Sequence, residues 1–188
     1  MMEWKQSTTI PSKSYECGYC GNPLASNKGY STQSQTPAAF IYLCHHCGQP
    51  TYFNSGGKQY PGPAFGGAVS HLPSEEVKVV YREARDCMKV DACTAAVMCC
   101  RKLLMNVAVA EGAKEGQTFV EYINYLQAQG FMTGKTKDWV NHIRKKGNEA
   151  NHEIKVMQRK DAEQLITFVE TFLRTNYEFP EMLEKPEE

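Results

Sequence analysis

Two identical cysteine motifs near the amino terminus are the clearest chemical feature of this 188-residue sequence. Each motif reads Cys-x-x-Cys-Gly, and 23 residues separate the two cysteine pairs. Close pairs of thiolates, each followed by a glycine that permits a tight turn, are typical of sites in which four sulfur atoms surround one zinc ion. The pattern therefore predicts one structural zinc ion held by Cys17, Cys20, Cys44 and Cys47.

The same cysteines have competing interpretations: a redox dithiol, paired disulfides or four unrelated thiols. A redox motif needs one pair inside a thioredoxin-like fold, and this region is too short for that fold. His45 and His46 lie inside the second motif and are alternative ligands, but the symmetry of the motifs favours four cysteines. With four ligand positions filled, no position remains for a zinc-bound water, which argues against a catalytic zinc.

A second group of chemically active residues lies between positions 139 and 152. If this segment is one helix, Arg144, Asn148 and His152 recur at every fourth position and form a polar stripe. Arginine pairs with phosphate oxygens, an amide orients a ligand, and imidazole transfers protons near neutral pH. In the structural alternative, Asn148 caps a local turn and His152 ends the helix. Spacing alone leaves both interpretations open.

The elements that must position these residues fall into two regions of different composition. Residues 1–55 contain both cysteine motifs but too few apolar residues for an ordinary core. We therefore expect a small zinc ribbon there, with short strands at 40–43 and 51–53. Residues 56–73 are rich in glycine and proline, which predicts an extended linker. Residues 179–188 predict an acidic tail.

Residues 74–178 have the apolar spacing of a helical bundle. We expect helices at about 74–88, 91–110, 117–129, 136–152 and 160–176, with Ser74 and Asp91 as amino-terminal caps and Gly130 as a stop signal. The second helix is apolar on most sides and should be central and most buried. The predicted fold class is mainly α, with a small zinc ribbon of short β-strands before a bundle of about five helices.

Composition excludes several classes of protein. No apolar run approaches the roughly 20 residues of a membrane span, and the first ten residues lack the apolar core of a secretory signal. Lysine plus arginine number 21, as do aspartate plus glutamate, so a general nucleic-acid coat protein is disfavoured. We expect a cytoplasmic protein without membrane association, in which reduced core thiols accompany the zinc site. These thiols are Cys87, Cys93, Cys99 and Cys100.

The sequence resembles a known family in two stretches, AAVMCCRKLL at 95–104 and IRKKGNEANH at 143–152. Both look like domain-of-unknown-function family 4145, which is grouped with the HEPN (higher eukaryotes and prokaryotes nucleotide-binding) superfamily. The likeness covers about residues 74–178, and the Gly-Asn-x-x-x-His stretch is its most specific part. It implies a HEPN-like helical bundle that tends to dimerise, in bacterial proteins often linked to restriction, phage defence or toxin systems. A zinc ribbon before the bundle is also familiar in such proteins.

Many HEPN proteins are metal-independent ribonucleases with an Arg-Asn-x-x-x-His core. Asn148 and His152 match this core, whereas Gly147 stands at the position of its arginine. In the enzyme that this resemblance implies, His152 is the general acid or base, Asn148 orients it, and Arg144 supplies a cation one turn earlier. The phosphate groups of the RNA would be bound by Lys145 and Lys146, together with Arg101 from the second helix. The candidate residues are therefore His152, Asn148 and Arg144 for catalysis, and Arg101, Lys145 and Lys146 for RNA binding.

Two functional hypotheses follow. In the first, the chain is a homodimeric zinc-ribbon and HEPN-like protein that binds RNA or a nucleotide, either as a metal-independent endoribonuclease or as a degenerate relative. In the second, it is a non-catalytic interaction module, in which the ribbon docks a protein partner and the bundle forms the dimer. The ribbon's aromatic residues could form a recognition surface, stack on bases or simply make its small core. They are Tyr15, Tyr19, Tyr30, Tyr42, Tyr52 and Phe53.

Overall fold

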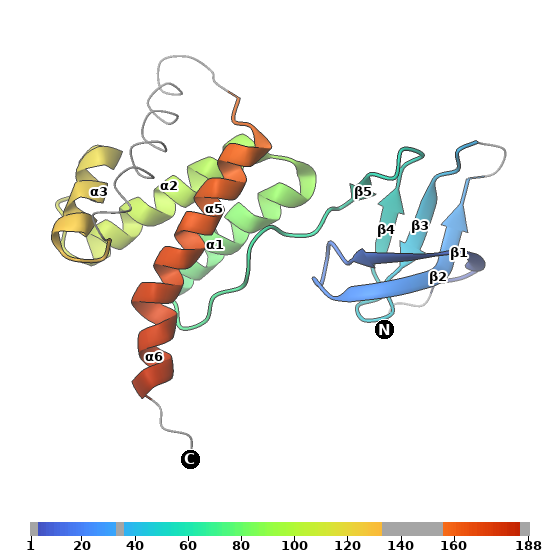
Figure 1. The fold of residues 1–188 in the computed structure, drawn as a ribbon, viewed down its shortest axis with the longest axis horizontal. Coiled ribbons are helices and arrows are strands. Elements are labelled where there is room, and N and C mark those ends of the chain that lie inside the picture. Colours follow the sequence, from blue (N-terminus) through green and yellow to red (C-terminus); the bar gives the residue numbers. More distant parts are fainter. Residues whose placement is uncertain (1–3, 33–35, 133–155, 185–188) are drawn as a thin grey trace. The chain divides into compact units, whose positions relative to one another are not determined.

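The chain forms two compact units, one holding the strands and one holding the long helices (Figure 1). The structure is a computed structural model that describes residues 4–32, 36–132 and 156–184. The first unit runs to Ala64 and also includes Met88–Val90, which form a short 3-10 turn, η1. The second unit comprises Phe65–Cys87 and the residues from Asp91 onward.

The first unit is one antiparallel sheet with the strand order β1-β2-β3-β4-β5. β1 (Thr8–Glu16) and β2 (Pro23–Ser31) form one hairpin, and β3 (Phe40–Leu43) and β4 (Pro50–Phe53) form a second. β5 (Gln59–Tyr60) pairs with β4 at the edge. Each cysteine motif is the turn of one hairpin, so the sheet holds the two motifs in equivalent positions.

A small aromatic core holds the sheet together. Ile10, Tyr42 and Phe53 are buried together, with Tyr15 and Phe40 packed against them. The rings of Tyr15 and Tyr42 meet the ring of Phe53 edge to face, at centroid distances of 5.3 and 5.6 Å. This geometry is favourable for aromatic rings, but the core remains too small to stabilise a unit of this size by burial alone.

The second unit is built around α2 (Cys93–Ala110) (Figure 1). Three helices contact it: α1 (Glu75–Cys87), α3 (Phe119–Ala128) and α5 (Arg159–Leu173). Eight residues of α2 are buried, in agreement with its predicted central position. Among the described residues, α2 is the one helix long and apolar enough to cross a membrane. Its packing against three helices accounts for this composition, because a core helix is apolar on most sides.

Local sequence signals set several helix ends. The amide of Val77 donates to Ser74 Oγ at 3.3 Å, and Thr118 and Glu121 form a capping box at the start of α3. Gly130 follows α3 with a φ of +85°, which confirms it as the stop signal. The π-helical turn η3 (Arg174–Glu178) joins α5 to α6 (Phe179–Glu184). The helix predicted at 136–152 lies outside the described residues.

The architecture is mixed α/β rather than mainly helical, which corrects the predicted fold class. The strands expected at 40–43 and 51–53 are present, but β1 and β2 have nine residues each and the sequence pattern does not reveal them. The sheet also continues to Tyr60, inside the predicted linker. Likewise, part of the predicted acidic tail forms α6.

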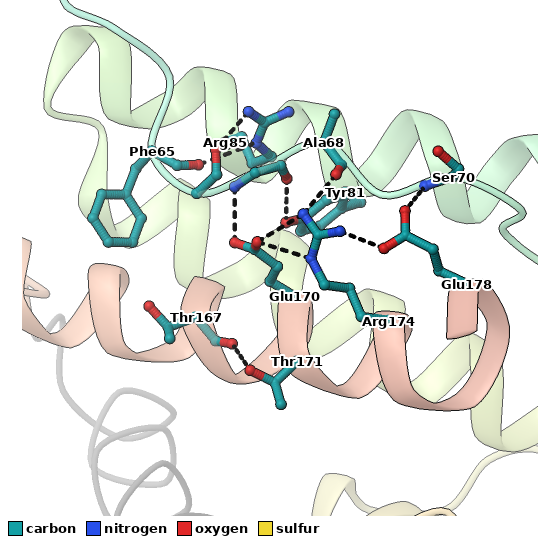
Figure 2. Close-up of polar contacts among 12 residues, drawn as sticks. Phe65, Ala68, Ser70, Tyr81, Arg85, Thr167, Glu170, Thr171, Arg174 and Glu178 are labelled. Carbon is teal, nitrogen blue, oxygen red and sulfur yellow. Dashed lines mark hydrogen bonds and ion pairs between the residues drawn. The ribbon is translucent and has the colours of Figure 1, made fainter. Parts of the chain in front are cut away.

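The glycine-rich segment 65–70, which we call the strap, is fixed to α1 in the second unit (Figure 2). The guanidinium of Arg85 donates to the carbonyl oxygens of Phe65 and Gly66, with the shortest of these hydrogen bonds at 2.6 Å. The hydroxyl of Tyr81 donates to the carbonyl oxygen of Gly67 at 2.8 Å. Side chains of α1 therefore satisfy backbone groups that a loop would otherwise present to water.

The strap is also fixed to the end of α5 (Figure 2). The carboxylate of Glu170 accepts a hydrogen bond from the amide of Gly67 at 2.8 Å. Arg174 lies between the two carboxylates of Glu170 and Glu178 and pairs with both. Its guanidinium also donates to the carbonyl oxygen of Ala68 at 2.9 Å, and Glu178 accepts from the amide of Ser70 at 2.7 Å.

Candidate metal centre

The four cysteines of the two motifs come together between the hairpin turns. Their sulfur atoms all lie within 4.8 Å of one another. The Sγ atoms of Cys17 and Cys47 are 3.7 Å apart, and those of Cys20 and Cys44 are 3.8 Å apart. These distances are far longer than a disulfide bond of about 2.05 Å. The cysteines are therefore free thiols grouped around a common centre.

The spacing of these two sulfur pairs matches that of a four-sulfur metal site. In a regular tetrahedron with zinc–sulfur bonds of about 2.3 Å, neighbouring sulfur atoms lie about 3.8 Å apart. Cys17 and Cys44 are buried, Cys47 is half-buried and Cys20 is exposed. The four residues can thus hold one metal ion, and their softness suits zinc.

The backbone repeats itself around the two motifs. The amide of Gly21 donates to the carbonyl oxygen of Cys17 at 2.8 Å, and the amide of Gly48 does the same to Cys44 at 2.8 Å. Both glycines have positive φ angles, of 72° and 74°. A residue with a side chain rarely adopts this conformation. The glycine that ends each motif is therefore needed to turn the chain around the sulfur atoms.

Asn22 tunes the exposed cysteine of the cluster. Its side-chain amide donates to the sulfur of Cys20 at 3.4 Å. Although desolvation opposes the effect, hydrogen bonds from Asn22 lower the pKa of Cys20 to about 6. Burial has the opposite result at Cys17, whose thiol pKa is raised. The lowered pKa of Cys20 favours its thiolate, which is the form that binds metal.

The predicted catalytic stripe falls outside the part of the chain that the structure describes. This applies to Arg144, Asn148 and His152, and to the neighbouring Lys145 and Lys146. Of the residues predicted to contact RNA, the structure places Arg101.

Arg101 is half-buried on α2, facing α3. Its guanidinium carbon lies 4.4 Å from the ring centroid of Phe119. Nη1 of this side chain is buried and donates no hydrogen bond to the described residues. Desolvation lowers the pKa of Arg101, but arginine remains charged at any physiological pH. The structure thus holds a cation on an aromatic ring, with one nitrogen that has no hydrogen-bond partner among the described residues.

Sequence reasoning missed the polar network of the strap. Glu170, Arg174 and Glu178 recur at every fourth position, which is a detectable ion-pair signal on a helix. Their partners in the strap, however, lie more than a hundred positions away in the sequence. The network binds backbone groups of the chain itself, so its role is to hold the strap.

These features define a two-part chain, with a cysteine cluster able to hold a metal ion on a small sheet and a separate helical unit. Residues 82–187 match the family described as Domain of unknown function (DUF4145). The match covers more than half of the chain, and the chain belongs to this family. It also confirms the family named from the two sequence stretches. No match was found among curated proteins or among solved structures.

Proposed function

We propose that this chain is a zinc-binding, HEPN-like protein that binds RNA or a nucleotide, acting in the cytoplasm as a homodimer. The observation that carries the proposal is the environment of Arg101. A half-buried guanidinium has lost part of its hydration, and Nη1 recovers no hydrogen bond from the described residues. A buried donor without a partner is costly, so Nη1 calls for a partner beyond the described residues, and a bound ligand is the partner that we propose.

Phosphate is the ligand chemistry that fits this arginine. Guanidinium groups bind phosphate oxygens through strong charge-assisted hydrogen bonds. The guanidinium carbon also lies 4.4 Å from the ring centroid of Phe119, a contact that holds the cation in place. The sequence places further cations at Arg144, Lys145 and Lys146, which would add to a phosphate site if they face Arg101.

The metal has a structural role in this proposal. We infer zinc because four thiolates at tetrahedral spacing are its characteristic ligands and leave no coordination position for substrate. Metal analysis of the purified protein tests this inference. We expect one equivalent of zinc per chain, retained by the wild type and lost when Cys44 is replaced. A different metal, or none, would contradict it.

A binding assay tests the proposed RNA site. We expect Arg101→Ala to weaken RNA binding by about tenfold, because one charge-assisted hydrogen-bonding group is removed. Lys102→Ala is the matched control, since it removes an exposed cation from the next position of the same helix. Equal effects of the two variants would show that Arg101 contributes only its charge, and an unchanged affinity would remove it from the site.

Cleavage is tested separately from binding. In the enzymatic form of the proposal, the imidazole of His152 transfers a proton and Asn148 orients this imidazole. No metal ion takes part in the reaction. RNA is incubated with wild type and His152→Ala in excess chelator, while helicity and dimerisation are monitored because chelation can strip the structural metal. Cleavage that disappears in the variant supports a ribonuclease. A folded dimer that binds RNA without cutting it supports the degenerate relative, in which Gly147 replaces the motif arginine.

A further inference from the structure

Four side chains form a row across one face of the sheet. Tyr30 on β2 pairs with Ile41 on β3, Ile41 pairs with Tyr52 on β4, and Tyr52 pairs with Tyr60 on β5. Directly paired residues of an antiparallel sheet point to the same face. We call Tyr30, Ile41, Tyr52 and Tyr60 the aromatic row. The core residues Phe40, Tyr42 and Phe53 alternate with it and point to the opposite face.

Two tyrosines of the aromatic row are exposed to solvent, whereas Tyr30 and Ile41 are half-buried. Tyr52 is 42% exposed and Tyr60 is 40% exposed. Their ring centroids lie 6.1 Å apart with the planes tilted by 30°. The hydroxyl of Tyr30 donates to the carbonyl oxygen of Lys5 at 2.6 Å, which fixes this ring at the other end of the row. A hollow of about 130 Å³ lies between Tyr30, Ile41 and Tyr52.

The charges beside the row suit a polyanion. Lys58 places its ammonium nitrogen 5.2 Å from the ring centroid of Tyr60. Lys28 lies two residues before Tyr30 on β2, so strand alternation gives it the same face. Residues 1–64 contain four lysines and two glutamates, with no aspartate or arginine. The thiolate cluster lies at the opposite ends of β2 and β4 from Tyr30 and Tyr52, which keeps its negative charge away from them.

We propose that the aromatic row is a binding site for single-stranded nucleic acid, with bases stacked on Tyr52 and Tyr60 and phosphates near Lys28 and Lys58. Exposed rings on a sheet with flanking cations are the two features that such binding requires, since every base has a face that can stack. Where the bound nucleic acid is RNA, this inference rests on the proposed function. It adds to that function a contact between the nucleic acid and the zinc ribbon.

The test is a titration of the full-length, zinc-loaded protein with a fluorescent single strand of about 12 nucleotides. Oligouridine, oligothymidine and a duplex of the same length are compared. We expect the Tyr52→Ala/Tyr60→Ala double variant to bind single strands at least about tenfold more weakly, because two stacking surfaces are lost. The Tyr52→Phe/Tyr60→Phe variant keeps the rings and should bind like the wild type.

Two controls distinguish loss of binding at the aromatic row from loss of the fold and from loss of the contact made by Arg101. Tyr19→Ala removes an equally exposed tyrosine of the same unit that is outside the row, and should leave affinity unchanged. Zinc content and circular dichroism must match between variants. If the alanine double variant binds like the wild type while Arg101→Ala does not, the row is not the site and the proposed function survives. If the wild type binds none of the nucleic acids, both proposals are overturned, and the row would then fit a protein partner.

Discussion

Asn22 is the polar residue through which the sheet adjusts the chemistry of the cysteine cluster. It donates to the sulfur of Cys20, and its hydrogen bonds are the largest of the effects that lower the pKa of this thiol. Hydrogen bonds to a ligating sulfur both orient it and stabilise its negative charge. The residue lies two positions after its partner, within the first hairpin turn. We therefore expect it to contribute to metal affinity without being a ligand.

We expect Asn22→Ala to weaken metal binding by about 10- to 100-fold, the usual effect of removing such a partner. The thiol pKa of Cys20 rises in this variant, so protons compete better with the metal and the loss of affinity grows as pH falls. Competition with a chromophoric chelator at several pH values measures the metal affinity of each variant. Asn27→Ala, at an exposed position of β2, is the control. Equal affinities for both variants at every pH would contradict this role.

Asp91 shows where residue-level prediction from the sequence fails. Its position before an apolar segment favours a helix cap, but the cap of α2 is Ala92 and no side chain completes it. Asp91 instead adopts a φ of 59° and pairs with Arg159 at the start of α5. That partner lies 68 residues away, and local spacing cannot reveal it. The cysteine motifs were predictable because their information is local.

At the scale of elements, β1 and β2 were missed because few of their inward positions are apolar. Ile10 is the one fully buried residue of β1, and the buried positions of β2 are Leu24, Ser26 and Gly29. The usual alternation of apolar and polar residues is therefore absent. At position 29 a side chain is excluded by steric hindrance, because a Cβ atom on Gly29 would lie 1.8 Å from the carbonyl oxygen of Ile41. Helices α2 and α5 were predictable because their apolar spacing is regular.

The strap depends on Arg174, which connects two carboxylates and a backbone carbonyl. We expect Arg174→Ala to lower the free energy of unfolding of the helical unit by about 1–3 kcal/mol, because Glu170 and Glu178 lose their partner. Arg159→Ala is the matched control. Its ion pairs are more exposed, so the loss should be about 0–1 kcal/mol. Urea denaturation followed by helical circular dichroism measures both.

A side chain added to the strap at Gly67 should collide with the same network. A Cβ atom on Gly67 would lie 2.5 Å from Nη2 of Arg174 and 2.7 Å from Oε1 of Glu170. We expect Gly67→Ala to push the arginine out of place and to destabilise the helical unit. Combined with Arg174→Ala, it should cost less than the sum of the two single changes, since both disturb one contact. Strict additivity in a double-mutant cycle would disprove the coupling.

Glu178 makes the stability of this network depend on pH. Hydrogen bonding from the amide of Ser70, followed by the ion pair with Arg174, holds the pKa of Glu178 below its ordinary value. The unfolded chain therefore binds more protons than the folded chain at acidic pH. The contribution is complete above the ordinary pKa of about 4.3 and is lost as pH falls through the lower folded value.

Thermal unfolding of wild type and Glu178→Gln between neutral pH and acid measures this contribution. The wild type should be the more stable at neutral pH, and the difference should shrink as Glu178 becomes protonated. Comparing the two proteins removes the effect of the other carboxylates with lowered pKa values, Glu76 and Glu121. A difference that stays constant over the whole range would show that this carboxylate does not respond to pH.

At the scale of the whole molecule, the two units differ in what stabilises them. The helical unit buries a continuous set of large side chains, among them Leu103, Ile123, Leu165 and Ile166. The sheet has only its small aromatic core and the residues around the cysteine cluster. A unit this poor in apolar burial normally needs a metal or disulfides to fold. The chain's cysteines are free, so we expect a metal ion at the cysteine cluster to supply the missing stability.

Removing the metal should therefore unfold the sheet and leave the helices folded. We expect Cys44→Ser, or chelation of the wild type, to abolish the near-ultraviolet signal of the sheet's packed tyrosines, because an unpaired set of thiols cannot replace the ion. Helical circular dichroism at 222 nm should change little, since the helical unit keeps its own core. Cys99→Ala, outside the cluster, controls for loss of a thiol. Collapse of the helical signal together with the sheet would mean that the units fold as one, and that the metal stabilises the whole chain.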